Sequence, residues 1–174
     1  MVKLGVFSDT HVGRTIPKAI SDLRRRAFRH AFSQAIDIFI EEKVDYVIHA
    51  GDVFEKRSMT PDDSVFVKEE FQRLVDGLNK GVKIFVVRGN HDGTLGNSAL
   101  DYVEHPLAKY FKILGEGTLG GEPEVYEDEN VAVLGFGYTP YTSIKLEATE
   151  DAIKNSFNLC RAPHKIFIIH SFVE

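Results

Sequence analysis

An α/β fold is predicted by the alternation of short apolar runs with longer amphipathic segments in the first half of the chain. Apolar runs at residues 3–8, 44–50 and 82–87 have the length and composition of buried strands. The segments between them, residues 22–43 and 62–78, repeat apolar side chains at helical spacing. The order strand, helix, strand, helix, strand is typical of a parallel sheet covered by helices.

Capping signals support both helices. Ser21 precedes the first helix as a candidate N-cap, since its hydroxyl can accept a hydrogen bond from a free backbone amide. Asp62 and Asp63 fall in the first turn of the second helix, where negative charge is favourable. Asn79-Lys80-Gly81 is a typical C-terminal cap for that helix.

The second half of the chain is predicted to add shorter elements separated by turns. Residues 115–124 hold four glycines and a proline, which indicates a turn-rich loop. Tyr138 and Tyr141 lie in a later loop, where they either pack against the sheet or stack on a base. The predicted elements are strands at 111–114, 125–126, 131–136 and 165–169 and helices at 98–104 and 147–159.

The composition is that of a single domain. The chain has 174 residues, of which 43% are hydrophobic, enough for a substantial core. One cysteine excludes an internal disulfide framework and fits a reducing compartment. With no signal peptide and no apolar run of roughly 20 residues, we expect a cytoplasmic protein without a membrane association.

The charge of the chain limits how it could bind nucleic acid. A net charge of −5 argues against a protein that binds DNA through a basic surface alone. It leaves room for a metal-dependent nuclease, because metal ions bring positive charge of their own. Arg24, Arg25, Arg26 and Arg29 either form a solvated helix face, the simpler interpretation, or contact phosphates.

Polar side chains gather where the predicted strands end. The carboxyl ends of parallel strands meet at one edge of a sheet, which is where ligands bind in α/β folds. His49 lies inside its strand instead, so we interpret it as a structural histidine, with contact to the site as the alternative. The residues at the strand ends are Asp9, His11, Asp52, Asn90, His91 and His170.

These residue types favour a metal centre. Carboxylate, amide and imidazole donors without a thiolate suit hard or borderline divalent ions. One carboxylate shared between two subsites would hold a pair of metals, typically about 3.5–4 Å apart. Taken singly, each motif could also be an ordinary polar turn, with a capping Asp or a surface His.

The spacing of these residues resembles the calcineurin-like metallophosphoesterase family. The matching motifs are Asp9-x-His11, Gly51-Asp52, Gly89-Asn90-His91-Asp92 and the late His170. The residues around them, 8–13, 51–54 and 90–94, look most like the nuclease subunit of the DNA double-strand-break repair complex. The resemblance implies an α/β two-sheet sandwich flanked by helices.

The resemblance also implies residue roles and partners. Asp9 and His11 would hold one metal ion, Asp52 would bridge, and Asn90 and His170 would hold the second ion. His91, oriented by Asp92, would act as the general acid while the metals activate a water molecule. The nuclease group implies two Mn²⁺ ions, a DNA substrate, an SMC-type ATPase partner and a homodimer. Residues 22–43 or 98–102 are the candidate dimer faces, although their periodicity fits intramolecular packing equally well.

Two departures from the family pattern matter. The Gly-x-His motif that follows the late histidine is absent, so we expect residues 1–174 to be a C-terminally truncated phosphoesterase domain with weak metal affinity and little activity. Glu55 stands where many of these nucleases carry a histidine that positions the phosphate, which leaves the balance of exonuclease and endonuclease activity open.

Two other functions remain as alternatives. One is a metallophosphoesterase that acts on a nucleotide, a cyclic nucleotide or a phosphoprotein. The other is a non-catalytic module for dimerisation and DNA binding, which the missing ligands favour.

Overall fold

A four-stranded parallel sheet forms the centre of the computed structural model, which describes residues 1–79, 81–94, 96–115, 125–138 and 146–170, with only the backbone of 146–149. The strand order is β1-β2-β3-β4, and all neighbours are parallel, as the sequence predicted. The strands are β1 (Leu4–Phe7), β2 (Tyr46–His49), β3 (Lys83–Val87) and β4 (Phe111–Leu114).

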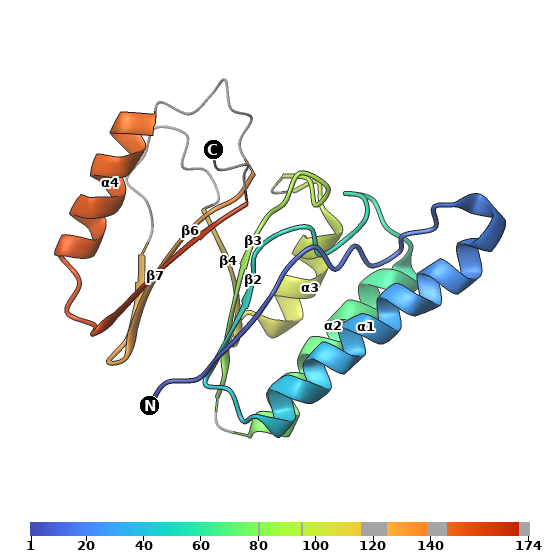
Figure 1. Ribbon diagram of the computed structural model, residues 1–174, viewed down its shortest axis with the longest axis horizontal. Helices are drawn as coiled ribbons and strands as arrows, with labels where there is room; N and C mark the ends of the chain where they lie inside the picture. Colours follow the sequence, from blue (N-terminus) through green and yellow to red (C-terminus); the bar gives the residue numbers. More distant parts are fainter. Residues whose placement is uncertain (80, 95, 116–124, 139–145, 171–174) are drawn as a thin grey trace.

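Three helices cover one face of this sheet (Figure 1). They are α1 (Ser21–Glu41), α2 (Pro61–Leu78) and α3 (Ala99–Leu107), and a short 3₁₀ helix, η1 (Lys18–Ile20), leads into α1. Phe71 packs edge to face against Phe32 and Phe7 between helices and sheet, and Phe7 is tilted against Phe32, with ring centroids 5.4–6.3 Å apart. Burying each such ring stabilises the fold by about 1.5–3 kcal/mol.

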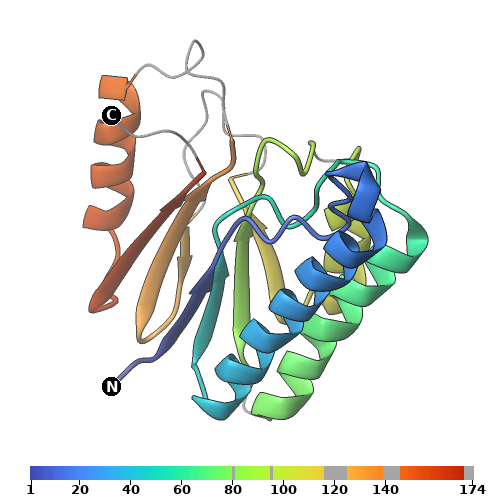
Figure 2. The same ribbon diagram turned by 45° about the vertical axis from the view of Figure 1, so that its right-hand side comes forward.

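A second, three-stranded sheet lies against the other face of the first, and α4 (Leu146–Asn158) covers its outer side (Figure 2). β5 (Val125–Glu127) pairs antiparallel with β6 (Val131–Phe136), and β6 pairs parallel with β7 (His164–Ile169). The two-sheet sandwich with flanking helices is therefore confirmed. Apolar side chains from both sheets fill the space between them: Tyr46, Ile48, Phe85, Val87, Leu114, Val131, Val133 and Ile168.

The second sheet leaves β1 uncovered. Gly5 is buried on the helix side of β1, whereas Leu4 and Val6 point the other way and are 40% and 59% exposed. The successive side chains of a strand point to opposite faces. The inner face of the sandwich is therefore open at β1.

The helix ends follow the predicted signals with one exception. Thr60 caps α2 by accepting a hydrogen bond from the amide of Asp63, and Asn79 ends it in the left-handed conformation. The prediction of Ser21 as N-cap of α1 was wrong: Ser21 is the first helical residue, and Ile20 occupies the cap position without a side-chain hydrogen bond. Within the described residues, no helix is both long and apolar enough to cross a bilayer.

Two of the four arginines on α1 bind the start of α2. Arg25 and Arg29 contact Asp63 at 2.8 and 2.6 Å, and both also contact Asp62. Arg24 instead lies over the ring of Phe28, 4.9 Å from its centroid. Arg25 and Arg29 therefore form neither a solvated face nor a phosphate contact in this structure, because their guanidinium groups connect α1 to α2.

Candidate metal centre

The loops that follow β1 and β2 run side by side at the carboxyl edge of the sheet. The amide of Asp9 donates to the carbonyl of Gly51, and the amide of His11 donates to the carbonyl of Asp52, both at 3.0 Å. Val12 and Phe54 continue this parallel pairing. Residues about forty positions apart in the sequence are thereby fixed next to one another.

The backbone is strained where these loops carry their polar side chains. Asp9, His11 and Asp52 have φ values of 52°, 40° and 55°. Such left-handed conformations cost residues other than glycine roughly 1 kcal/mol or more each, and they concentrate at functional sites. Here they turn the side chains of these loops toward a common point.

Two glycines allow the loops to approach closely. A Cβ atom on Gly89 would lie 1.9 Å from Asp52 Oδ1, and one on Gly51 would lie 2.3 Å from His170 Nδ1. No real side chain tolerates such distances, so only glycine leaves room for the carboxylate and the imidazole at these points.

Asp52 lies at the centre of the gathered side chains. It is only 3% exposed, and its Oδ1 accepts a hydrogen bond from the amide of His91 at 2.9 Å. Its Oδ2 lies 3.7 Å from His11 Nε2 and 3.6 Å from His170 Nε2, too far for hydrogen bonds. A carboxylate oxygen and two imidazole nitrogens thus face the same space.

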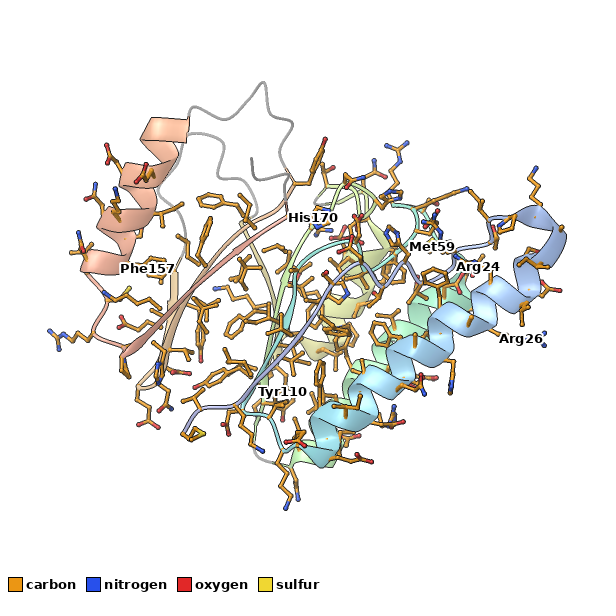
Figure 3. The ribbon with its side chains drawn as sticks, viewed as in Figure 1. Arg24, Arg26, Met59, Tyr110, Phe157 and His170 are labelled. Carbon is orange, nitrogen blue, oxygen red and sulfur yellow. The ribbon has the colours of Figure 1, made fainter. Side chains whose placement is uncertain are left out.

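The ligand atoms form two groups that share Asp52. Atoms of His11, Asp52 and His91 lie within 4.8 Å of one another, and so do atoms of Asp9, Asp52 and His170. Asn90 joins the second group, with its Oδ1 3.2 Å from His170 Nε2. All six residues predicted at the strand ends meet here, including His170 from the second sheet, which lies at the end of β7 (Figure 3).

Backbone carbonyls orient two of the imidazole rings. His170 Nδ1 lies 2.8 Å from the carbonyl of Ala50, and His91 Nδ1 lies 2.7 Å from the carbonyl of Glu55. Because a carbonyl only accepts hydrogen bonds, both rings carry a proton on Nδ1, and Nε2 is left to face the site. This is the arrangement in which a histidine can ligate a metal ion.

Asp92 has a different place from the one the sequence predicted. We expected its carboxylate to orient His91, but the carbonyl of Glu55 does so. Asp92 is fully buried and accepts hydrogen bonds from the amides of Gly89, Phe54 and Val53 at 2.9, 3.0 and 3.3 Å. Burial raises the pKa of Asp92 despite these three donors. Its contacts join the loop after β3 to the loop after β2.

His49 lies beneath the site, as the structural interpretation predicted. Its Nε2 is 2.9 Å from the hydroxyl of Thr10, which stands between the two candidate ligands of the first loop. Its ring packs against Phe7 with centroids 4.5 Å apart. Burial lowers the pKa of His49 to about 3, so the ring is neutral at pH 7.

One of the two loop tyrosines lies near the site. Tyr138 is 41% exposed, and its ring centroid is 6.4 Å from that of His170. It is therefore not packed into the core and stays available for stacking. Tyr141 lies outside the described residues.

The residues present fit divalent metal ions. Nitrogen lone pairs and carboxylate oxygens converge on Asp52, and among the residues that the structure describes no lysine or arginine pairs with it. Electron-rich atoms that face one another in a buried site are stabilised by a cation between them. The set of oxygen and imidazole donors suits such an ion.

The chain belongs to the calcineurin-like phosphoesterase family, whose profile matches residues 2–170. Proteins of this family use divalent metal ions, in agreement with the donor groups around Asp52. The chain is therefore a metal-dependent phosphoesterase domain by family.

Within the family, the chain is similar in sequence to proteins named DNA double-strand break repair protein Mre11. It is 36% identical over 121 residues to the protein of Thermoplasma acidophilum, which covers 69% of this chain and 29% of that protein. It is 29% identical over 174 residues to the protein of Methanosarcina mazei, which covers 96% of this chain and 25% of that protein. The chain thus spans less than a third of the length of either relative.

Solved structures overlap the fold only loosely. A nuclease MPE from Pseudomonas putida has a TM-score of 0.44 and 19% identity, over 79% of this chain and 56% of that one. A dimetal phosphatase from Danio rerio has a TM-score of 0.45 and 16% identity, over 89% and 52%. Overlap this weak does not support an inference about function.

Proposed function

We propose that this chain is the catalytic part of a Mn²⁺-dependent DNA phosphodiesterase, a nuclease of double-strand-break repair. The observation that carries the proposal is Asp52, whose buried carboxylate belongs to both groups of candidate ligands. The sequence similarity to proteins named for DNA double-strand break repair supports DNA as the substrate.

In this proposal Asp9 and His11, whose Oδ1 and Nε2 lie 3.9 Å apart, hold one metal ion, Asn90 and His170 hold the second, and Asp52 bridges them. This division differs from the two groups of ligand atoms described above, in which Asp9 lies with His170. Bound ions would neutralise charge on the phosphate oxygens and acidify the attacking water molecule. The strained loops and the two close-approach glycines keep these ligands in place before substrate arrives, which reduces the cost of reorganisation.

His91 is the proposed general acid. The carbonyl of Glu55 holds the Nδ1 proton of His91 at 2.7 Å, so the imidazolium form of the ring would give its second proton, the one on Nε2, to a leaving group and return to the neutral form. The departing 3′ oxygen of a DNA strand needs such a proton. Asp92 contributes by holding together the loops that carry His91 and Asp52.

The proposed partners follow from the same relationship. An SMC-type ATPase and a second copy of this chain are the proposed partners of the whole protein. The exposed side chain of Tyr102 on α3, at 76%, supports the second of the two candidate segments, residues 98–102, as the dimer face.

Hydrolysis assays with added Mn²⁺ test the proposal. The full-length protein should cleave linear duplex DNA and a bis-aryl phosphate faster than a mono-aryl phosphate, whereas residues 1–174 alone should have little activity. A preference for the monoester would instead support another metallophosphoesterase, one that acts on a nucleotide or a phosphoprotein.

The variant His91→Ala separates an enzyme from a non-catalytic DNA-binding module. Loss of a general acid typically costs about 10²–10⁴-fold in rate. DNA affinity should change little, because the imidazole acts on the leaving group. Unchanged turnover in His91→Ala would remove the general acid from the mechanism.

A further inference from the structure

Glu55 is a buried carboxylate three residues beyond the bridging aspartate. It is 8% exposed, and its amide donates to the carbonyl of Val12 at 3.1 Å. Val12 also pairs with Phe54, the residue before Glu55, in a parallel bridge, and both side chains are fully buried. The backbone at Glu55 is therefore fixed, and its side chain cannot turn freely into solvent.

The carboxylate of Glu55 contacts one basic residue and one candidate ligand. Its Oε2 accepts a hydrogen bond from Arg14 Nη1 at 3.0 Å and lies 3.1 Å from His11 Nδ1, at an angle that does not make a hydrogen bond. Arg14 is itself placed near the ring of Phe28, with the guanidinium carbon 5.9 Å from the centroid. A buried carboxylate needs such partners, because burying it alone is costly.

The contact with His11 is on the side of the ring away from the metal centre. His11 Nε2 faces Asp9 and Asp52 at 3.9 and 3.7 Å, whereas Nδ1 faces Glu55. The negative charge of a carboxylate oxygen this close to Nδ1 favours a proton on Nδ1, which leaves the lone pair of Nε2 for a metal ion. Glu55 thus stands outside the donor groups and acts on one of them.

The carbonyl of the same residue holds the candidate general acid. It accepts from His91 Nδ1 at 2.7 Å, and the rings of His11 and His91 stand at 89° with centroids 4.9 Å apart. One residue therefore sets two imidazoles relative to each other, one with its side chain and the other with its backbone.

We propose that Glu55, anchored by Arg14, is a positioning residue that fixes the tautomer and orientation of His11 as a metal ligand. The proposal rests on the metal centre of the proposed function but not on its substrate. A carboxylate held in this way offers a phosphate no hydrogen-bond donor, so Glu55 serves the metal centre and does not bind substrate.

The first test measures the imidazole directly in metal-free protein. Nitrogen-15 NMR should find His11 protonated on Nδ1 in the wild type and a mixture of tautomers in Glu55→Leu. His91 should keep its tautomer in both, because its partner is a backbone carbonyl. An unchanged His11 tautomer in a folded Glu55→Leu protein would overturn the proposal.

The second test measures Mn²⁺ affinity by calorimetry. Glu55→Gln should weaken binding about 10–100-fold, the usual effect of losing an outer partner of a ligating histidine. Arg14→Gln should weaken binding less, and the double variant should bind as Glu55→Gln does, because Arg14 acts through Glu55. Additive losses would contradict this.

The matched control is Glu129→Gln, which removes the same charge from an exposed position in the turn between β5 and β6. It should bind Mn²⁺ as the wild type does, and an equal loss in Glu129→Gln and Glu55→Gln would overturn the positioning role. If the wild type binds no Mn²⁺, the proposed function fails, while the tautomer measurement still decides the role of Glu55.

Discussion

Two aspartates, Asp52 and Asp63, are buried to almost the same degree but have opposite surroundings. Asp63 is 1% exposed and is bound by Arg25, Arg29 and the hydroxyl of Thr60. Burial alone would raise the pKa of Asp63, but these hydrogen bonds outweigh it and lower the pKa. This carboxylate finds its cations within the protein.

Among the described residues, no lysine or arginine pairs with Asp52. It is 3% exposed, accepts one backbone hydrogen bond, and faces imidazole nitrogens at 3.6–3.7 Å. The partners of a buried carboxylate thus distinguish a residue that stabilises the fold from a candidate metal ligand. A buried carboxylate that pairs with arginines of the same protein connects two secondary-structure elements. A buried carboxylate that faces imidazole lone pairs is suited to bind a cation from solution.

The largest expected effect is the loss of activity in Asp52→Asn. In the full-length protein, Mn²⁺-dependent hydrolysis of a bis-aryl phosphate should fall at least about 1000-fold, since metal stabilisation of the transition state is worth several kcal/mol. Calorimetry should find Mn²⁺ binding lost as well. The metal-free protein should unfold at the same or a higher temperature, because an uncompensated buried charge is removed. A marked loss of stability would make Asp52 a structural residue like Asp63.

The reverse pattern is expected for Asp63→Asn. Its unfolding free energy in urea should fall by about 2–4 kcal/mol, because two guanidinium groups lose their buried partner. Mn²⁺ affinity should stay within about threefold of the wild type, since Asp63 belongs to neither donor group. Loss of metal binding without loss of stability would contradict the structural role of Asp63.

His49 should give a pH dependence of stability distinct from that of Asp63. Its pKa of about 3 lies below the unfolded value of about 6.5, so the folded state prefers the neutral ring. Stability should therefore fall as pH decreases below about 6.5, by roughly 2 kcal/mol at about pH 5. The stabilisation from Asp63, whose pKa is lowered, is present above about pH 4 and is lost only as pH falls further.

Urea unfolding at several pH values measures this, with His49→Gln as the variant that does not titrate. The slope between about pH 5 and pH 6.5 should flatten in His49→Gln and persist in Asp63→Asn. Equal slopes in His49→Gln and the wild type would mean that His49 does not cause the pH dependence of the unfolding free energy in this range.

The smallest effect is expected for Arg26→Ala. Its side chain is exposed and points away from the body of the molecule (Figure 3). The unfolding free energy should change by no more than about 0.5 kcal/mol, in contrast to Arg25→Ala, which removes a partner of Asp63. DNA affinity measured at two salt concentrations should also be unchanged. A weaker salt dependence in Arg26→Ala would support the phosphate-contact interpretation of the arginine run.

The sequence by itself determined the parallel sheet and which residues gather at the candidate metal centre. Buried strands are apolar runs, and the polar residues that end parallel strands reach the same edge, so Asp9, Asp52 and Asn90 could be placed together from spacing alone. The chemistry of their side chains then indicated a divalent metal ion.

Only the tertiary structure decided which neighbour orients each side chain. Glu55 meets His11 and Arg14 because two loops about forty residues apart pair through their backbones, and Asp92 turns to backbone amides instead of to His91. Likewise, Arg25 and Arg29 meet Asp63 only because α1 packs beside α2. Such contacts depend on φ values and packing angles that no local pattern of residues encodes, because they arise when separate segments are brought together.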